Sequence, residues 1–327
     1  MRVPRIGLMA LSAVLAVATA GCTTTPGGGP SGTTTKISIA TQPWLGYGPW
    51  YIAADQGYFA EAGLDVTLKD FEADADMLAA LAAGQVDALN VASHGALQMR
   101  EADVAAKIVL LEDASTSADA ILTNGTLKSV KELKGQQVAY EEGSTSDLLL
   151  NYALSEAGLT AADIVKVPMG AADAGSALIA GRVAAAVTYE PYISQAKTAN
   201  PGLAVIYEAS AKEGLISDVL MVGDAFAAQH PEAIRALIKA WDKAVSYYKA
   251  NPTEGRAIIA KGVGADPAEL ATAFDGVEFF SLADNLDLLT GEYATSTLPA
   301  IQQVAVTAGI IQGTTEPAAA IDAQYLK

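Results

Sequence analysis

Residues 36–92 read KISIATQPWLGYGPWYIAADQGYFAEAGLDVTLKDFEADADMLAALAAGQVDALNVA, and this stretch decides the fold. Its apolar pattern predicts three strands separated by two helices: strands over 36–41, 65–71 and 86–92, helices over 50–62 and 74–83. The same rhythm returns further along the chain, with strands over 136–140, 164–169 and 183–189 and helices over 146–157 and 172–180. Strands that alternate with helices indicate a mostly parallel sheet covered on both faces.

Two short sequence matches relate the first strand–helix pattern to the second. LAAGQV at residues 81–86 matches LIAGRV at 178–183, and EAGL at 61–64 recurs at 156–159, so the offsets are 97 and 95 residues. We infer an α/β protein of two similar lobes. Ligands of open α/β sheets bind beyond the carboxyl ends of the strands, so the cleft should lie where these ends face each other.

The chain becomes helical after Leu220, because apolar residues recur at helical spacing behind Pro231, and Asn251-Pro252 should end that helix. We expect this region to pack on the first lobe. The chain would then cross between the lobes twice, near residues 120–124 and 217–222, and paired crossings of this kind form a hinge. The predicted lobes are 36–122 with 219–327, and 123–218.

The N-terminal residues have the pattern of a targeting segment. Arg2 and Arg5 precede an apolar run over 6–20, which is shorter than the roughly 20 residues of a membrane span, and this favours a signal peptide over 1–21. Thr-Ala-Gly-Cys at 19–22 resembles a bacterial lipobox, although Thr19 replaces the usual large aliphatic residue. Cys22 is the only cysteine, so lipidation explains it better than a disulfide does. The alternative is an ordinary signal peptide beside an incidental cysteine.

Residues 22–35 consist almost entirely of Thr, Pro, Gly and Ser, which predicts a flexible linker. The formal net charge of −17 argues against nucleic acid and against an anionic membrane surface as partners. The chain has two histidines, His94 and His230, and neither a metal-ligand cluster nor a nucleophile or phosphate-loop motif. We therefore expect no cofactor, no metal and no enzymatic activity.

Four segments together resemble the nitrate/sulfonate/taurine-type periplasmic binding proteins: residues 37–68, 78–92, 129–150 (SVKELKGQQVAYEEGSTSDLLL) and 178–192 (LIAGRVAAAVTYEPY). The resemblance implies the type II periplasmic-binding-protein fold and a small-molecule solute delivered to an ABC permease. With the lipobox, it implies a protein anchored by lipid at the outer face of the cell membrane. Pyrimidine-precursor synthases share this fold but use internal cysteine and histidine, which disfavours that alternative here. FFSLADN at 279–285 resembles a subgroup linked with urea-carboxylase or guanidine metabolism.

The predicted strand ends supply the candidate ligand-binding residues. They form an aromatic group after the first strand, pairs at two equivalent strand ends, a strand-to-helix turn and a carboxylate at the second crossing: Gln42, Trp44, Tyr47, Trp50, Ser93, His94, Glu141, Ser144, Thr145, Tyr189, Glu190 and Asp218. Each has a structural alternative, which is core packing for the aromatic residues, helix capping for Ser144 and Thr145, and a solvated or capping role for the rest.

The charge of these candidates bears on the ligand. They include no Arg or Lys, while Glu141, Glu190 and Asp218 are carboxylates, and burying an unpaired charge costs several kcal/mol. A cation or an N–H-rich solute, such as a guanidinium, amine or urea-like compound, would pair with them, and aromatic faces would add to its binding. The alternative is an anion such as nitrate, taurine or an alkanesulfonate, held by backbone N–H groups over residues 143–146.

Overall fold

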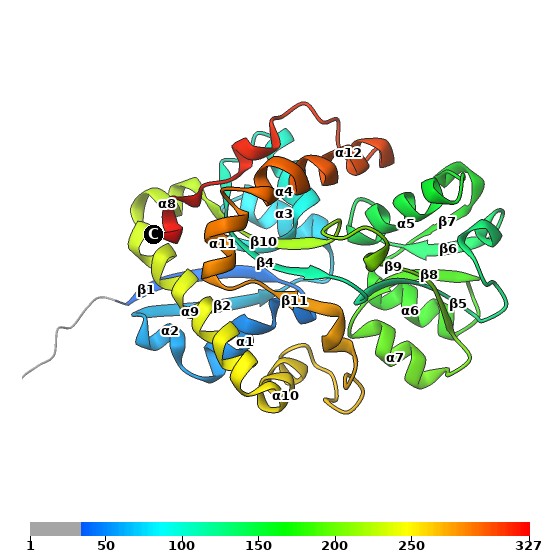
Figure 1. Ribbon diagram of the computed structural model, residues 1–327, viewed down its shortest axis with the longest axis horizontal. Helices are drawn as coiled ribbons and strands as arrows, with labels where there is room; N and C mark the ends of the chain where they lie inside the picture. The colour runs from blue at the N-terminus through cyan, green and yellow to red at the C-terminus, as the bar shows by residue number, and fades with distance from the viewer. Residues whose placement is uncertain (1–33) are drawn as a thin grey trace, which may run out of the picture. The chain divides into compact units, whose positions relative to one another are not determined.

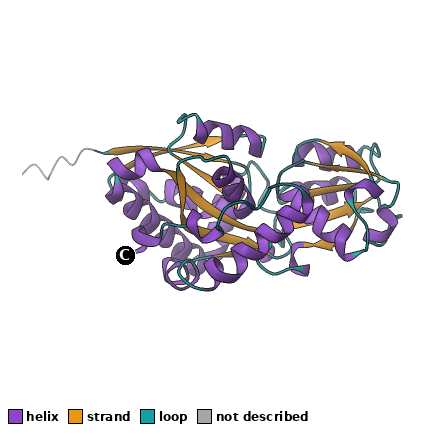
Figure 2. Cartoon of the chain, turned by 90° about the horizontal axis from the view of Figure 1, so that it is seen from above, coloured by secondary structure: helices purple, strands orange, loops and turns teal. Residues whose placement is uncertain are grey.

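The computed structural model describes residues 34–327. The predicted signal peptide, Cys22 and the linker up to residue 33 lie outside the described residues. Two mixed sheets organise the described chain, and we call each sheet with its helices a lobe (Figures 1 and 2). The predicted α/β architecture of two lobes is therefore confirmed.

Lobe 1 contains a sheet of six strands in the order β11-β4-β10-β3-β1-β2. Strands β1, β2 and β3 run parallel, whereas β10 is antiparallel to β3 and β4, and β11 is antiparallel to β4. The strands are β1 (Thr35–Thr41), β2 (Leu64–Asp70), β3 (Ala88–Ala92), β4 (Ala106–Ser115), β10 (Ser217–Gly223) and β11 (Val277–Phe279).

Lobe 2 contains a sheet of five strands in the order β7-β6-β8-β5-β9, drawn in green at the right of Figure 1. Strand β6 lies parallel to β7 and β8, and β5 runs antiparallel to β8 and β9. The strands are β5 (Asp119–Thr123), β6 (Gln137–Tyr140), β7 (Val165–Pro168), β8 (Ala185–Tyr189) and β9 (Ala204–Glu208).

The predicted duplication is visible in the strand order. Strand β1 lies between β2 and β3 as β6 lies between β7 and β8, all parallel. The repeat also holds for the helices that cross over to the third strand of each set, α3 (Asp74–Ala82) and α6 (Ala171–Ile179). In lobe 1 the predicted helix over 50–62 is instead two helices, because Gly57 adopts a φ of 75° between α1 (Gly48–Asp55) and α2 (Tyr58–Glu61).

The predicted helix behind Pro231 is α9 (Pro231–Ala250), and it packs on α1 of lobe 1. Its apolar stripe buries Trp241, and α10 (Pro252–Gly262) follows directly after Asn251. No helix within residues 34–327 is both long enough and apolar enough to span a bilayer. The remaining helices are α4 (Ser93–Glu101), α5 (Thr145–Glu156), α7 (Tyr192–Ala199), α8 (Asp224–Gln229), α11 (Leu282–Leu288) and α12 (Leu298–Ala308).

The positions expected for the two crossings were wrong by a few residues. Residues 120–124 mostly belong to β5 of the second sheet, and residues 217–222 belong to β10 of the first sheet. The links between the sheets come earlier in the chain, at 116–118 and 209–216. Both expected segments are apolar runs that pair as strands, so the chain crosses just before each run. The division into lobes at residues 122 and 218 remains a proposal.

Candidate ligand cleft

A small cavity lies between the two lobes where strand ends converge. Its walls come from the segment after β1, the start of β5, the start of α5, the end of β8, and the start of β10 with the residue before it. The lining residues are Gln42, Trp44, Tyr47, Asp119, Thr145, Tyr189, Ile216 and Asp218. We call this cavity the inner cleft. Its free space is only about 20 Å3. The convergence follows from the parallel strands, whose carboxyl ends meet at one edge of each sheet.

Contacts between the lobes explain the small volume. Trp44 of lobe 1 meets Tyr189 of lobe 2 edge-to-face, with ring centroids 5.8 Å apart. The amide of Gln98 donates to the Gly143 carbonyl oxygen at 3.1 Å, and His94 Nε2 lies 3.3 Å from the same oxygen. These contacts join lobe 1 to lobe 2, so the lobes are closed on each other around the inner cleft.

Aromatic donors in lobe 1 are engaged with carboxylates. The Trp44 indole N–H donates to Asp113 Oδ1 at 3.2 Å, and the Tyr47 hydroxyl donates to Asp218 Oδ1 at 3.0 Å. Asp113 and Asp218 are cross-strand partners on β4 and β10, so Asp113 lies beside Asp218, which lines the cleft. One residue earlier on β4, Glu112 accepts a hydrogen bond from the Trp50 indole at 2.7 Å.

These carboxylates are buried without a basic partner. Among residues 34–327, Glu112 Oε2, Asp113 Oδ2 and Asp119 Oδ2 have no hydrogen-bond partner, and no Lys or Arg lines the inner cleft. The ion pairs found within residues 34–327 use other carboxylates: Glu61, Glu142, Asp163, Glu232 and Asp275. Burial without a partner of opposite charge makes the ionised form of these carboxyl groups costly.

Burial also determines the pKa values of the carboxyl groups in and beside the cleft. Desolvation raises the pKa of Asp119 to about 8 and that of Asp218 to about 6, and the hydrogen bond from Tyr47 limits the rise at Asp218. Burial also raises the pKa of Asp113 well above its ordinary value, and the neighbouring Asp218 carboxylate raises it further. A cation in the cleft would reverse these shifts, because an opposite charge favours the ionised carboxylate.

Six of the twelve predicted ligand residues line the inner cleft: Gln42, Trp44, Tyr47, Thr145, Tyr189 and Asp218. Gln42 also brings an unpaired donor, because its Nε2 atom is buried without a hydrogen-bond partner. Their contact with a ligand remains a proposal.

The structure does not bring the other six predicted residues into this cavity. Trp50 is a core residue between Phe59 and Trp241, as the packing alternative expected. Ser144 caps α5 by accepting from the Ser146 N–H at 3.1 Å. The remaining four bond to other residues of the chain: Ser93 to Ser217 and Tyr293, His94 to Gly143 across the lobes, Glu141 to the Asp74 N–H across the lobes, and Glu190 to Ser194.

The sequence reasoning missed two lining residues, Asp119 and Ile216. A signal for Asp119 was present, because it lies in the apolar run Ala118-Asp119-Ala120-Ile121 as Asp218 lies beside Val219. The same signal marks Glu112 and Asp113 in the run over 107–114. A carboxylate within a buried strand is rare unless it has a partner.

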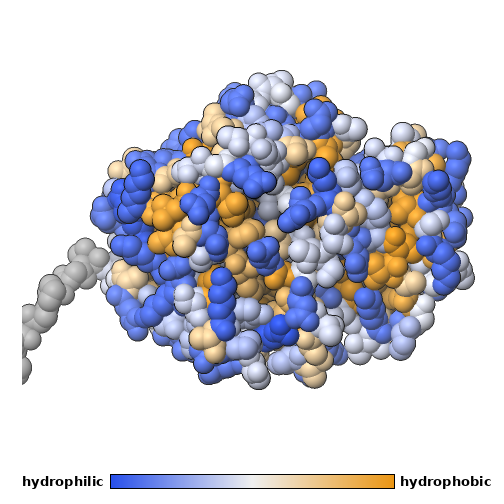
Figure 3. Space-filling model, in the orientation of Figure 1, coloured by the Kyte–Doolittle hydropathy of each residue, from blue (hydrophilic) through white to orange (hydrophobic). Residues whose placement is uncertain are grey.

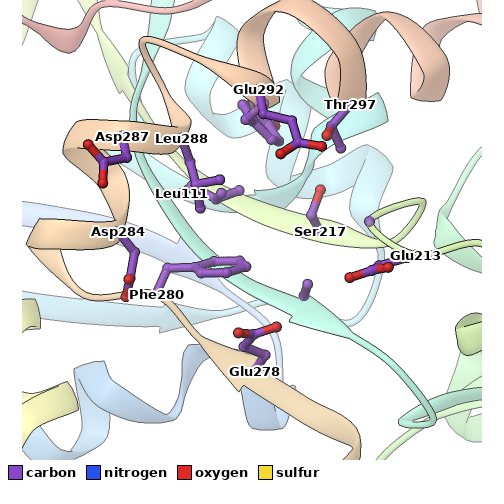
Figure 4. Close-up of a pocket in the computed structure, with 13 residues that line it drawn as sticks. Leu111, Glu213, Ser217, Glu278, Phe280, Asp284, Asp287, Leu288, Glu292 and Thr297 are labelled. Carbon is purple, nitrogen blue, oxygen red and sulfur yellow. The ribbon is translucent and has the colours of Figure 1, made fainter.

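A second, larger cavity of about 540 Å3 lies by β4 and β10 (Figure 4). The Phe280 ring and Leu111 form part of its wall, and its carboxylates come from Glu213, Glu278, Asp284, Asp287 and Glu292. Its buried hydroxyls, Ser217 and Tyr293, are both bonded to Ser93. The buried hydroxyl groups of this cavity are therefore already hydrogen-bonded within the described residues. Within residues 34–327, no cluster of His, Cys, Asp and Glu could hold a metal ion.

Comparison with known proteins identifies the relatives of this chain. A protein of Brucella abortus (strain 2308) that is named only as a binding protein is 29% identical over 226 residues, 68% of this chain and 69% of its own. An aliphatic sulfonates-binding protein of Bacillus subtilis (strain 168) is 28% identical over 249 residues, 74% of each chain. A pyrimidine phosphate synthase of Aspergillus parasiticus also matches, at 26% identity over 236 residues, 67% of this chain and 68% of its own.

Solved structures of binding proteins share the fold of this chain. The alkanesulfonate-binding protein SsuA from Xanthomonas axonopodis pv. citri, solved with bound MOPS, superposes with a TM-score of 0.73 at 18% identity, covering 89% of this chain and 99% of its own. This similarity confirms the periplasmic-binding-protein fold. The NMT1/THI5-like family model matches residues 45–255, which is more than half of the chain. The chain therefore belongs to the NMT1/THI5-like family, and the resemblance to nitrate/sulfonate/taurine-type binding proteins is confirmed.

Proposed function

We propose that this chain is the extracytoplasmic solute-binding component of an ABC importer and that its ligand is a small nitrogenous cation or N–H-rich solute. Guanidinium, amines and urea-like compounds are the candidate class. One observation carries the choice of ligand: the inner cleft holds Asp119 and Asp218, backed by Asp113, and no basic residue lines it. Binding proteins of importers present their solute to a membrane permease, so the permease is the expected partner.

Charge complementarity supports a cation over an anion. A cation between Asp119 and Asp218 would pair with the free Asp119 Oδ2 atom and relieve the cost of the buried carboxylates. The faces of Trp44 and Tyr189 would add about 0.5 to 2 kcal/mol of cation–π attraction.

An anion in the same cleft could accept from Gln42 Nε2, which is buried without a partner among residues 34–327, but other donors near the cleft are already engaged. The Trp44 indole and the Tyr47 hydroxyl already donate to Asp113 and Asp218. At the start of α5, the N–H groups of Gly143 and Ser146 donate to Asp147 and to the Ser144 hydroxyl. The relatives named for sulfonates keep the anion as the competing candidate, and the experiments below separate the two.

A binding role also fits better than an enzymatic one. The relative from Aspergillus parasiticus is a synthase, but the only cysteine of this chain is Cys22, within the predicted lipobox. We propose that Cys22 carries the lipid that holds the protein at the outer face of the membrane. Cys22→Ser should release the protein into the soluble fraction, and retention equal to that of the native chain would contradict the anchor.

The ligand assignment is tested by titration calorimetry of guanidinium, methylammonium, urea, nitrate, taurine and propane-1-sulfonate. Asp119→Asn and Asp218→Asn should each weaken binding of the cations by at least about tenfold, since buried charge pairs contribute several kcal/mol. Asp65→Asn removes the same charge from an exposed position on β2 and should leave binding unchanged. Binding of an anion that improves in the Asp119 and Asp218 variants would overturn the cation assignment.

A further inference from the structure

The inner cleft has little free space for a ligand. A cavity needs roughly 10–15 Å3 of free space to hold one water molecule. The inner cleft offers about 20 Å3. In this closed arrangement it therefore has room for a small head group alone, and the rest of a larger ligand has to lie elsewhere.

A much larger cavity of about 690 Å3 adjoins the inner cleft, and we call it the outer vestibule. Tyr189 lines both cavities. Pro43 lines the vestibule and lies between Gln42 and Trp44, which line the cleft. Trp44, which lines the inner cleft, packs edge-to-face against this shared Tyr189 ring. A ligand that passes beside the Tyr189 ring would occupy both.

The walls of the outer vestibule have a definite chemistry. Aromatic rings come from Phe71, Tyr189 and Tyr192, and the Tyr189 and Tyr192 centroids are 5.4 Å apart. The charged residues in its lining are acidic, Asp70 and Glu72 among them, and none is Lys or Arg. Such a space receives an apolar or aromatic group and repels a carboxylate or sulfonate.

We propose that the ligand is an organic ammonium ion with an apolar substituent, its charged head between Asp119 and Asp218 and its substituent in the outer vestibule against Tyr189, Tyr192 and Phe71. This inference rests on the cationic ligand proposed above. An ammonium head has three donors and the size of one heavy atom, which matches the free space of the inner cleft and its unpaired carboxylate oxygen. An amine that ends in a sulfonate fits less well, because its second group would lie among the acidic residues of the vestibule.

Calorimetry at pH 8.5 with methylammonium, propylammonium and 2-phenylethylammonium tests the length of the ligand. Affinity should rise by roughly fourfold for each CH2 group that enters the vestibule. Tyr192→Ala should weaken 2-phenylethylammonium by roughly tenfold, the effect of losing one large apolar contact, and should leave methylammonium unchanged. Tyr247→Ala removes a half-buried tyrosine on α9 outside both cavities and serves as the matched control. The sulfonated amine 3-aminopropane-1-sulfonate should bind more weakly than propylammonium.

Two results would overturn this inference, and they are distinguishable. If methylammonium binds as tightly as 2-phenylethylammonium and Tyr192→Ala changes neither, the vestibule holds no part of the ligand and the cation assignment stands. If no ammonium ion binds and propane-1-sulfonate does, the cation assignment itself fails.

Discussion

At the residue scale, the site depends on buried carboxylates that have no basic partner among residues 34–327. Asp218 was predicted because a carboxylate beside apolar residues at a crossing needs a partner. Asp113 and Asp119 carried the same signal in longer apolar runs. What the sequence could not show is which strand ends face each other, because that depends on the pairing of β10 with β4 and on the closure of the lobes.

One glycine tests how tightly this arrangement is packed. Gly46 lies in the 3-10 turn between Trp44 and Tyr47, and a Cβ atom there would overlap the Asp113 carboxylate and the Trp44 indole nitrogen. Gly46→Ala should therefore lower the free energy of unfolding by about 1–3 kcal/mol through overpacking and weaken cation binding, as measured by denaturant titration and calorimetry.

The control for this substitution is Gly175→Ala in α6. There the nearest atom to a new Cβ is the Tyr192 carbonyl oxygen at 3.8 Å, so the methyl group has room. Alanine in the helix interior should be neutral or stabilising by up to about 1 kcal/mol. Equal effects of the two substitutions would contradict the packing described around Asp113.

At the scale of elements, the alternating pattern predicted the three mutually parallel strands of each lobe, which are β1, β2 and β3 in lobe 1 and β6, β7 and β8 in lobe 2. Their ends differ from the structure by at most two residues. Strands β4, β5 and β10 were not predicted, because runs such as IVLLED lack the alternation of a half-exposed strand. These strands are buried on both faces, and they provide Asp113, Asp119 and Asp218. The elements without a periodic signal thus carry two of the eight residues that line the inner cleft, Asp119 and Asp218.

The turn before α5 provides a prediction at this scale. The Ser144 hydroxyl accepts from the Ser146 N–H at the start of the helix, so Ser144→Ala should destabilise the protein by about 1 kcal/mol. Cation affinity should change little, because Ser144 does not line the inner cleft. Ser155→Ala near the exposed end of the same helix should be neutral. A large loss of affinity in Ser144→Ala, with stability unchanged, would show that its hydroxyl contacts the ligand.

At the scale of the whole molecule, charge couples the two lobes. Closure brings Glu141 of lobe 2 to the Asp74 N–H of lobe 1 at 3.1 Å, and desolvation raises the pKa of Glu141 to about 7. The face drawn in Figure 3 carries many hydrophilic residues between hydrophobic patches, whereas the acids of the cleft are buried. A cation in the cleft would replace the protons on these acids.

The pH dependence of stability follows from the sign of these shifts. A carboxyl group whose pKa is raised on folding stabilises the protein below its unfolded pKa, and this contribution is lost as the pH rises through the folded value. For Asp119 that value is about 8 and for Glu141 about 7. The melting temperature of the ligand-free protein should therefore fall between pH 6.5 and 8.5.

His94 does not offset the expected fall in melting temperature between pH 6.5 and 8.5. Burial lowers its pKa to about 4, so its contribution is complete above an unfolded value of about 6.5. Cation affinity should rise between pH 6.5 and 8.5, because the carboxyl groups of the cleft become ionised. Binding near pH 7 should release protons, and calorimetry in two buffers of different ionisation enthalpy can measure that release. Asp119→Asn should flatten the decline in melting temperature. A melting temperature that rises from pH 6.5 to 8.5 would contradict the protonation described for the cleft.

The most direct test of the account compares ligands of opposite charge and similar shape. Guanidinium and nitrate are both planar and trigonal, and propylammonium and propane-1-sulfonate share one alkyl chain. Titration calorimetry of all four at pH 8.5 should show binding of propylammonium and of guanidinium, each at least about tenfold tighter than its anionic counterpart, because Asp119 and Asp218 attract one charge and repel the other. Tighter binding of nitrate or of propane-1-sulfonate than of the matched cation would contradict the central claim that the inner cleft is a cation site.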